Sequence, residues 1–111
     1  MAEMTHSIEH LGDLLGSEGF LDDPRDWSED VAIVLAQCDG LPELTHDHWL
    51  IINALREHYR RFGTAPPAFS HLCNQHHLGR HCLERLFRSE REAWRIAGLP
   101  DPGEEAKTYM Q

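Results

Sequence analysis

Residues 45–63 of the 111-residue chain read THDHWLIINALREHYRRFG, and this stretch decides what kind of fold to expect. Large apolar residues recur in it every three or four positions, which is the spacing of one face of an α-helix. These residues are Trp49, Ile52, Leu55, Tyr59 and Phe62. Thr45 is a good N-terminal cap and Gly63 a good stop. The stretch therefore predicts a long helix whose apolar stripe packs into the core.

A shorter helix is predicted before this one, after the sequence Asp26-Trp27-Ser28. Either Asp26 or Ser28 can cap its first turn, and Gly40 ends it. Its apolar residues also share one face of a helix. They are Val31, Val34, Leu35 and Cys38.

Three more short helices are predicted after the stiff connection at residues 65–67. The first covers about residues 68–75, with Phe69, Leu72 and Cys73 facing inward, and the second lies near residues 81–87. The third begins at a capping box of Ser89 and Glu92 and ends at Gly98. The polar residues 103–111 are predicted to be a flexible C-terminal arm.

The segment before these helices, residues 7–23, is interrupted by Gly12, Gly16 and Gly19. Such spacing favours turns between short strands, so a small β-hairpin or meander that packs on the helices is expected. The predicted fold class is α+β and mostly helical, with residues 1–111 as one domain of about five short helices.

The composition, with 41% apolar and 26% charged residues, is typical of a globular domain. Residues 1–48 contain twelve acidic residues and one arginine, a charge of −11, whereas residues 49–95 contain eight arginines and four glutamates, a charge of +4. A net charge of −9 repels phosphate at long range, so nucleic acid is not expected as a partner. No long apolar run and no secretory pattern occurs, so we expect no membrane contact and a cytoplasmic location.

The chain has no Gly-rich phosphate loop, nucleophile elbow or HExxH motif, so nothing in it predicts an independent enzyme. Its three cysteines are Cys38, Cys73 and Cys82. An odd number excludes a complete disulfide framework, and reduced thiols are the default in the cytoplasm. We interpret each cysteine as a small, partly buried apolar residue.

Five residues of types that bind zinc fall within ten positions: Cys73, His76, His77, His81 and Cys82. No standard finger or knuckle spacing is matched and a glycine interrupts the run, so a solvated histidine-rich loop without metal is the expected reading. A helix-turn-helix with arginines on phosphates is a further alternative. Its arginines would be Arg80, Arg85, Arg88 and Arg91.

An ordered set of short motifs is similar to the DsrC/TusE family of sulfur-relay proteins. The motifs are Gly19-Phe20-Leu21, Trp27, Val31-Ala32, Leu35-Ala36, Leu44-Thr45, His48-Trp49, Leu55-Arg56-Glu57-His58-Tyr59, Pro67-Ala68, Leu86-Phe87 and Ile96-Ala97-Gly98-Leu99-Pro100. The resemblance covers about residues 8–102 and implies a small β-meander on five helices. It also implies persulfide transfer by a cysteine near the end of a C-terminal arm, in some members with a second cysteine just before the iAGLP motif.

This chain departs from that pattern where the chemistry would occur. The earlier cysteine position is occupied by Trp94, and the segment after Pro102, GEEAKTYMQ, has no cysteine. Ser70 stands where relatives have arginine, Arg88 where they have proline, and the loop between the third and fourth helices is shorter. Because sulfur transfer requires a thiolate, the usual carrier mechanism is not available to this chain.

We therefore predict a non-catalytic, partner-binding or regulatory member of the family, with no cofactor. Its expected partners are a sulfite reductase or a sulfur-transfer complex, and its predicted contact residues are Arg91, Trp94 and Arg95. The alternatives are a sulfur carrier that uses Cys73 or Cys82, and the helix-turn-helix regulator.

Overall fold

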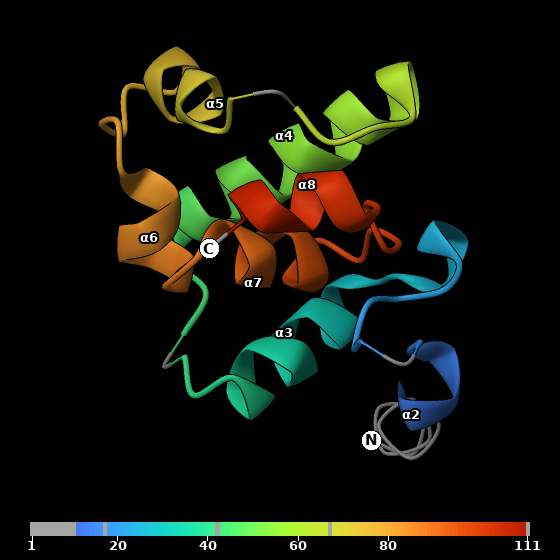
Figure 1. The fold of residues 1–111 in the computed structure, drawn as a ribbon. Coiled ribbons are helices and arrows are strands. Elements are labelled where there is room, and N and C mark those ends of the chain that lie inside the picture. Colours follow the sequence, from blue (N-terminus) through green and yellow to red (C-terminus); the bar gives the residue numbers. More distant parts are fainter. Residues whose placement is uncertain (1–10, 17, 42, 67, 111) are drawn as a thin grey trace.

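The computed structural model describes residues 11–16, 18–41, 43–66 and 68–110, and the structural statements below concern these residues. In chain order the elements are α2 (Leu11–Leu14), the 3-10 turn η1 (Pro24–Asp26), α3 (Glu29–Cys38), α4 (His46–Phe62), α5 (Ser70–Gln75), α6 (Cys82–Phe87), α7 (Glu90–Ile96) and α8 (Glu104–Tyr109) (Figure 1). The prediction of a mostly helical fold is confirmed. Within the described part of the chain, no helix has the length and apolar character needed to cross a membrane.

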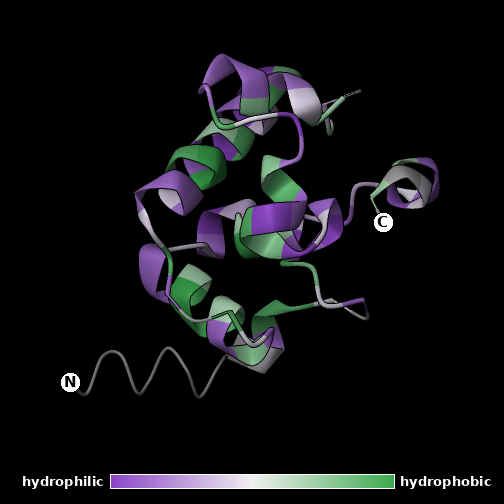
Figure 2. Cartoon of the chain, turned by 90° about the vertical axis from the view of Figure 1, so that its left-hand side faces the viewer, coloured by the Kyte–Doolittle hydropathy of each residue, from purple (hydrophilic) through white to green (hydrophobic). Residues whose placement is uncertain are grey.

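Helix α7 lies at the centre of the fold and packs against α3, α4 and α6 (Figure 1). Its residues Ala93, Trp94 and Ile96 are fully buried, as are Leu83 and Phe87 of α6. Figure 2 shows hydrophobic and hydrophilic residues alternating along the helices, as expected of helices with one buried face. One contiguous core of aliphatic and aromatic side chains therefore holds these helices together.

The helix predicted from residues 45–63 is α4, and both of its ends are set by local sequence. Gly63 has a φ of 69°, a left-handed conformation that glycine adopts without steric cost. At the other end, Nδ1 of His48 accepts a hydrogen bond from the Thr45 amide at 3.0 Å. Nε2 of His48 donates to the carbonyl of Leu86 at 2.7 Å, so one side chain caps α4 and ties it to α6.

The apolar stripe predicted on α4 forms part of the core, except at its last residue. Ile52 and Leu55 are fully buried, and Trp49 and Tyr59 pack against the core. Phe62 is 62% exposed, so the prediction that it is a core residue is wrong. The physical reason is that the last turn of α4 extends beyond the helices that cover its earlier turns (Figure 1).

The other predicted helices are confirmed within a few residues. Asp26 lies in the turn before α3, and Ser28 is its N-cap, with its hydroxyl accepting from the Val31 amide. Ser89 caps α7 in the same way, through the Glu92 amide at 3.1 Å. Helices α5 and α6 are shorter than predicted, with six residues each.

The prediction of an N-terminal β-hairpin or meander is wrong for the described residues. Leu11–Leu14 form the short helix α2, and the described part of residues 7–23 contains only one isolated antiparallel bridge, between Leu15 and Leu21. Residues 7–10 and 17 lie outside the described residues. The expected turn exists, since the Gly16 amide donates to the Phe20 carbonyl at 2.7 Å. Three residues after the bridge a proline begins η1, which leaves no room for a ladder.

The N-terminal segment is held by a clasp that joins three parts of the chain. Nε1 of Trp27 donates to the carbonyl of Ile96 at 3.0 Å, and the guanidinium of Arg56 lies 4.2 Å from the centroid of the Trp27 ring. Arg56 also donates to the carbonyls of Ala97 at 2.8 Å and Pro24 at 3.2 Å. These contacts bring η1, α4 and the end of α7 together.

Candidate functional site

Trp94, which stands where the family pattern has its earlier cysteine, is part of the core. Its side chain is fully buried and makes edge-to-face contacts with Tyr59 and Phe69, at centroid distances of 5.9 and 6.4 Å. Its Nε1 donates to the carbonyl of Pro100 at 2.7 Å. A contact residue must be exposed, so we do not retain Trp94 as a candidate for partner contact.

The segment predicted to be a flexible arm is folded as helix α8 and is docked on the body. Lys107 is 6% exposed and pairs with Glu18 at 2.5 Å, Asp101 at 3.0 Å and Glu104 at 3.0 Å. Hydrogen bonds to these carboxylates, above all to Glu18, raise the pKa of Lys107. Met110, one residue beyond α8, is 1% exposed. The ion pairs and the buried methionine hold α8 in place.

The two arginines predicted to contact a partner have different environments. Arg95 donates to the carbonyl of Gly19 at 2.9 Å and to Asp39 at 2.7 Å, and only 19% of its side chain is exposed. Arg91 lies 5.2 Å above the ring of Phe20 and pairs with Glu18 at 3.1 Å, with 41% of its side chain exposed. Arg95 is thus mainly structural here, whereas Arg91 presents part of its guanidinium to solvent.

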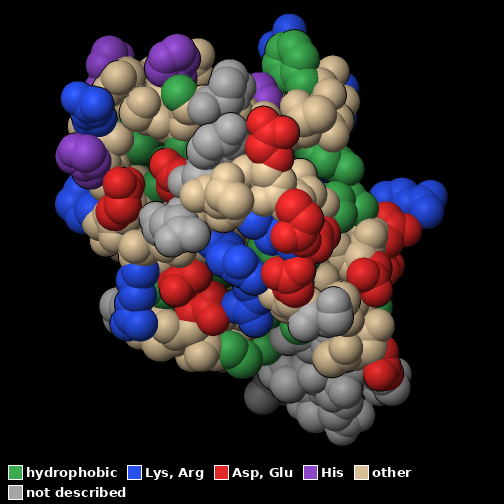
Figure 3. Space-filling model, viewed as in Figure 1, with side chains coloured by type: hydrophobic (Ala, Val, Ile, Leu, Met, Phe, Trp, Pro, Cys, Tyr) green, Lys and Arg blue, Asp and Glu red, His purple; other side chains and the backbone are tan. Residues whose placement is uncertain are grey.

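These charged groups lie on the face of the molecule that carries α8. Figure 3 shows basic side chains grouped at the middle of this face, with acidic side chains on both sides of them. Lys107 and Arg91 together lower the pKa of Glu18 by donating hydrogen bonds to it. Sequence analysis missed Glu18 and Lys107, and no local signal identifies them, because they are 89 residues apart in the chain.

Two of the three cysteines form a disulfide. Cys73, in α5, is bonded to Cys82, the first residue of α6, and both side chains are fully buried. The default of reduced thiols is therefore wrong for this pair in the structure. Cys38 is the free cysteine, and it is exposed at the end of α3, so the interpretation of Cys38 as partly buried is also wrong.

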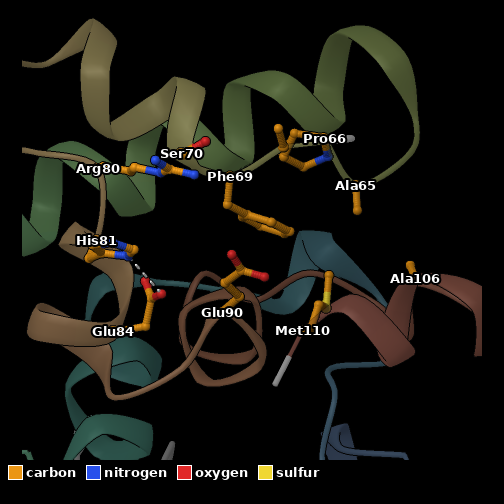
Figure 4. Close-up of a pocket in the computed structure, with 11 residues that line it drawn as sticks. Ala65, Pro66, Phe69, Ser70, Arg80, His81, Glu84, Glu90, Ala106 and Met110 are labelled. Atoms are coloured by element: carbon orange, nitrogen blue, oxygen red, sulfur yellow. Dashed lines mark hydrogen bonds and ion pairs between the residues drawn. The ribbon is translucent and has the colours of Figure 1, made fainter.

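A pocket of about 310 Å³ separates the loop between α5 and α6 from α8. Phe69 and Met110 contribute its apolar wall, while His81 and Glu84 contribute a polar one (Figure 4). Glu90, at the start of α7, points into the space between these walls (Figure 4). Burial raises the pKa of Glu90, and the nearby charge of Glu84 raises it further.

The histidine-rich loop lies on the surface above this pocket, where Figure 3 shows a group of histidines. His77 and His81 are exposed, and His81 is 3.4 Å from Glu84. Within the described residues, no three His, Cys, Asp or Glu side chains are arranged to hold a metal ion. The disulfide also occupies the two cysteines that the zinc alternative would need as thiolates.

Several arginines of the helix-turn-helix alternative contact other parts of this chain. Arg85 donates to the carbonyl of Leu78 at 2.6 Å, and Arg88 donates to the carbonyl of Gly40 at 3.1 Å. Together with the Arg91–Glu18 pair, these contacts give three of the four arginines a partner within this chain, so a nucleic acid is not needed to explain them.

Comparisons with known proteins agree with this architecture. A family model described as "DsrC like protein" matches residues 13–104. The chain belongs to the DsrC family. Sulfurtransferase TusE of Salmonella choleraesuis is 34% identical over 94 residues, which cover 78% of this DsrC-family chain and 85% of the relative. TusE of Escherichia coli is 32% identical over the same coverage.

Solved structures show that the fold is shared as well. The oxidized γ-subunit of the dissimilatory sulfite reductase, DsrC, of Archaeoglobus fulgidus is 35% identical, with a TM-score of 0.70 over 81% of this chain and 89% of that one. DsrC of Allochromatium vinosum is 36% identical, with a TM-score of 0.68 over 81% and 87%. The DsrC-family resemblance in the sequence motifs is thus confirmed, and with it the general link to sulfur relay.

Proposed function

We propose that this DsrC-family protein binds a protein partner of sulfur metabolism and does not itself carry persulfide sulfur. The observation that supports this most directly is the burial of Trp94 in the core, at the position where the family pattern has its earlier cysteine. The docked helix α8 adds to it, since residues 103–110 contain no thiol and are anchored by Lys107 and Met110.

The chemistry of sulfur transfer explains why these features matter. A carrier needs a thiolate that reaches the donor's sulfane sulfur and then the acceptor. A tryptophan offers no such atom, and the thioether of Met110 cannot form a persulfide. The family scaffold remains, so recognition of a partner is the activity that this chain can retain.

The second candidate function is a carrier with a relocated cysteine. The Cys73–Cys82 bond shows that two sulfurs lie close together, which a relay pair would require. Both side chains are fully buried, however, and a carrier must present its sulfur to other proteins. Their burial therefore supports the partner-binding proposal over this alternative.

The kind of partner is inferred from the relatives. The similar structures include a γ-subunit of dissimilatory sulfite reductase, and the similar sequences include the sulfurtransferase TusE. We propose a sulfite reductase or a sulfur-transfer complex as the partner. Arg91 is the contact residue of choice, because its guanidinium is partly exposed beside α8.

One experiment separates the carrier from the non-carrier. The protein is incubated with a small persulfide donor, and intact-mass and peptide mass spectrometry then look for one added sulfur atom. We expect none on Cys73 or Cys82, and a Cys38→Ser variant removes any signal from the exposed thiol. A sulfur adduct on Cys73 or Cys82 that passes to an acceptor thiol would refute the proposal.

A binding experiment tests the contact residue. Affinity for a purified dissimilatory sulfite reductase is measured by biolayer interferometry for the wild type, Arg91→Ala and Arg61→Ala. Arg61 is an exposed arginine of α4, so it is the matched control. We expect Arg91→Ala to weaken binding at least about fivefold and Arg61→Ala to leave it unchanged. Equal affinities for all three proteins would exclude Arg91 as a contact.

A further inference from the structure

The disulfide connects two short helices that have no side-chain caps at their N-termini. Helices α5 and α6 have six residues each, and neither has a side-chain hydrogen bond at its N-cap. Such short helices without caps are marginal by themselves. The Cys73–Cys82 bond joins them across a sequence separation of nine residues.

The backbone on both sides of α6 adopts unfavourable conformations. His77, in the loop, has a φ of 58°, and Arg88, directly after α6, has a φ of 76°. Residues with a Cβ rarely occupy this left-handed region, and doing so costs free energy. We therefore expect the covalent bond to contribute substantially to keeping the segment from Cys73 to Arg88 in its folded conformation.

The same segment forms one wall of the pocket beside α8. Arg80, His81 and Glu84 line it from the loop and α6, whereas Ala106 of α8 and Met110, directly after α8, line another part of it (Figure 4). Movement of the loop would change the pocket, whereas the contacts of α3 and α4 with α7 do not involve the loop. The disulfide thus closes the loop whose residues Arg80 and His81 line the pocket.

We propose that Cys73 and Cys82 are a dithiol–disulfide couple whose oxidation state sets the shape of this pocket. A thiolate of an external dithiol attacks one sulfur of the bond and releases the other cysteine as a thiol. The second thiol of the reductant then displaces the first cysteine, so the reductant becomes a disulfide and two electrons and two protons pass to the pair. A disulfide oxidant reverses the reaction.

Burial of the two sulfurs determines when this exchange occurs. Thiol–disulfide exchange needs direct approach to a sulfur atom, and both cysteine side chains are fully buried. The reaction therefore proceeds when the loop opens locally. Either oxidation state then persists until the loop next opens. The pocket therefore keeps the shape set by the last redox partner.

Hydrogen exchange with and without dithiothreitol tests the proposal, and alkylation with mass spectrometry counts the thiols in each sample. Only Cys38 should be alkylated in the untreated protein, and all three cysteines after reduction. The Leu78 amide donates to the Cys73 carbonyl at 2.9 Å, and the Cys82 amide donates to Gly79 at 3.3 Å. We expect reduction to accelerate exchange of these two amides at least about tenfold more than exchange of the α4 amides, which report the stability of the whole fold.

Two variants complete the design. Cys38→Ser should behave as the wild type in both conditions, and the double variant Cys73→Ala, Cys82→Ala should match the reduced wild type with or without dithiothreitol. Three alkylated cysteines in the untreated protein would overturn the proposal. So would unchanged exchange at Leu78 and Cys82, or an equal acceleration in α4, which would mean that reduction loosens the whole fold.

Discussion

Replacing Arg56 by methionine tests the reasoning about the clasp at the N-terminal segment. Methionine replaces the apolar stem of arginine but removes two hydrogen bonds, to the carbonyls of Ala97 and Pro24, and the stacking on Trp27. A hydrogen bond from a charged donor contributes about 1.5–3 kcal/mol and an exposed cation–π contact about 0.5–1 kcal/mol. Burial opposes part of this gain, and it lowers the pKa of Arg56. We expect a net loss of about 2–4 kcal/mol in the free energy of unfolding.

The measurement is urea unfolding followed by tryptophan fluorescence. Arg60→Met is the matched control, since Arg60 lies one turn later on α4 and pairs with the exposed Glu57 at 2.5 Å. An exposed pair of this kind contributes little, so the control should unfold as the wild type does. A shift of the urea midpoint in Arg56→Met no larger than that in Arg60→Met would show that these contacts do not stabilise the fold.

Three further predictions concern stability. Gly98 has a φ of 74° and a Cβ there would overlap Trp27, so Gly98→Ala should lower the free energy of unfolding by at least about 2 kcal/mol. Gly103 has a φ of 98° but open space around it, so Gly103→Ala should lower it by only about 1 kcal/mol. Equal losses in the two variants would contradict this prediction. Reducing the disulfide, which spans nine residues, should lower the free energy of unfolding by about 2.5–3 kcal/mol in urea titrations, and an unchanged midpoint would refute the estimate of loop entropy. The raised pKa of Glu90 means that folding favours its protonated form, so the free energy of unfolding falls as pH rises through the folded pKa. Glu90→Gln should therefore raise the melting temperature near pH 7 and much less near pH 4. Glu29→Gln, also at a first helical position but exposed, is the control and should not raise it.

The helices could be predicted from the sequence because their signals are local. In α4 the apolar period, the cap at Thr45 and the stop at Gly63 lie within one stretch of 19 residues, counted from Thr45 to Gly63. The position of Phe62 on the same stripe was misleading, since periodicity identifies a face but not where the neighbouring helices end. The glycines near the N-terminus likewise indicated a turn, but a turn alone does not determine the length of a ladder.

The candidate site was less predictable because it depends on contacts between distant residues. Lys107 meets Glu18 across 89 positions, and nothing in the polar tail distinguishes this lysine or indicates that α8 docks. Pairing of Cys73 with Cys82 likewise requires that two helices meet, whereas counting cysteines only excluded a complete framework. The absence of a thiol in the tail, by contrast, is a property of the sequence itself and was visible at once.

The contacts of residues 18–27 with residues 91–107 constrain the order in which the fold can assemble during translation. Glu18, Gly19 and Trp27 find their hydrogen-bond partners in Arg91, Arg95, Ile96 and Lys107. These partners are synthesised later, and a nascent chain cannot use them until they have left the ribosomal tunnel. Residues 18–27 must therefore stay undocked until residues 91–107 have emerged. A ribosome-associated chaperone that shields apolar segments would meet residues such as Phe20 and Leu21 during that interval.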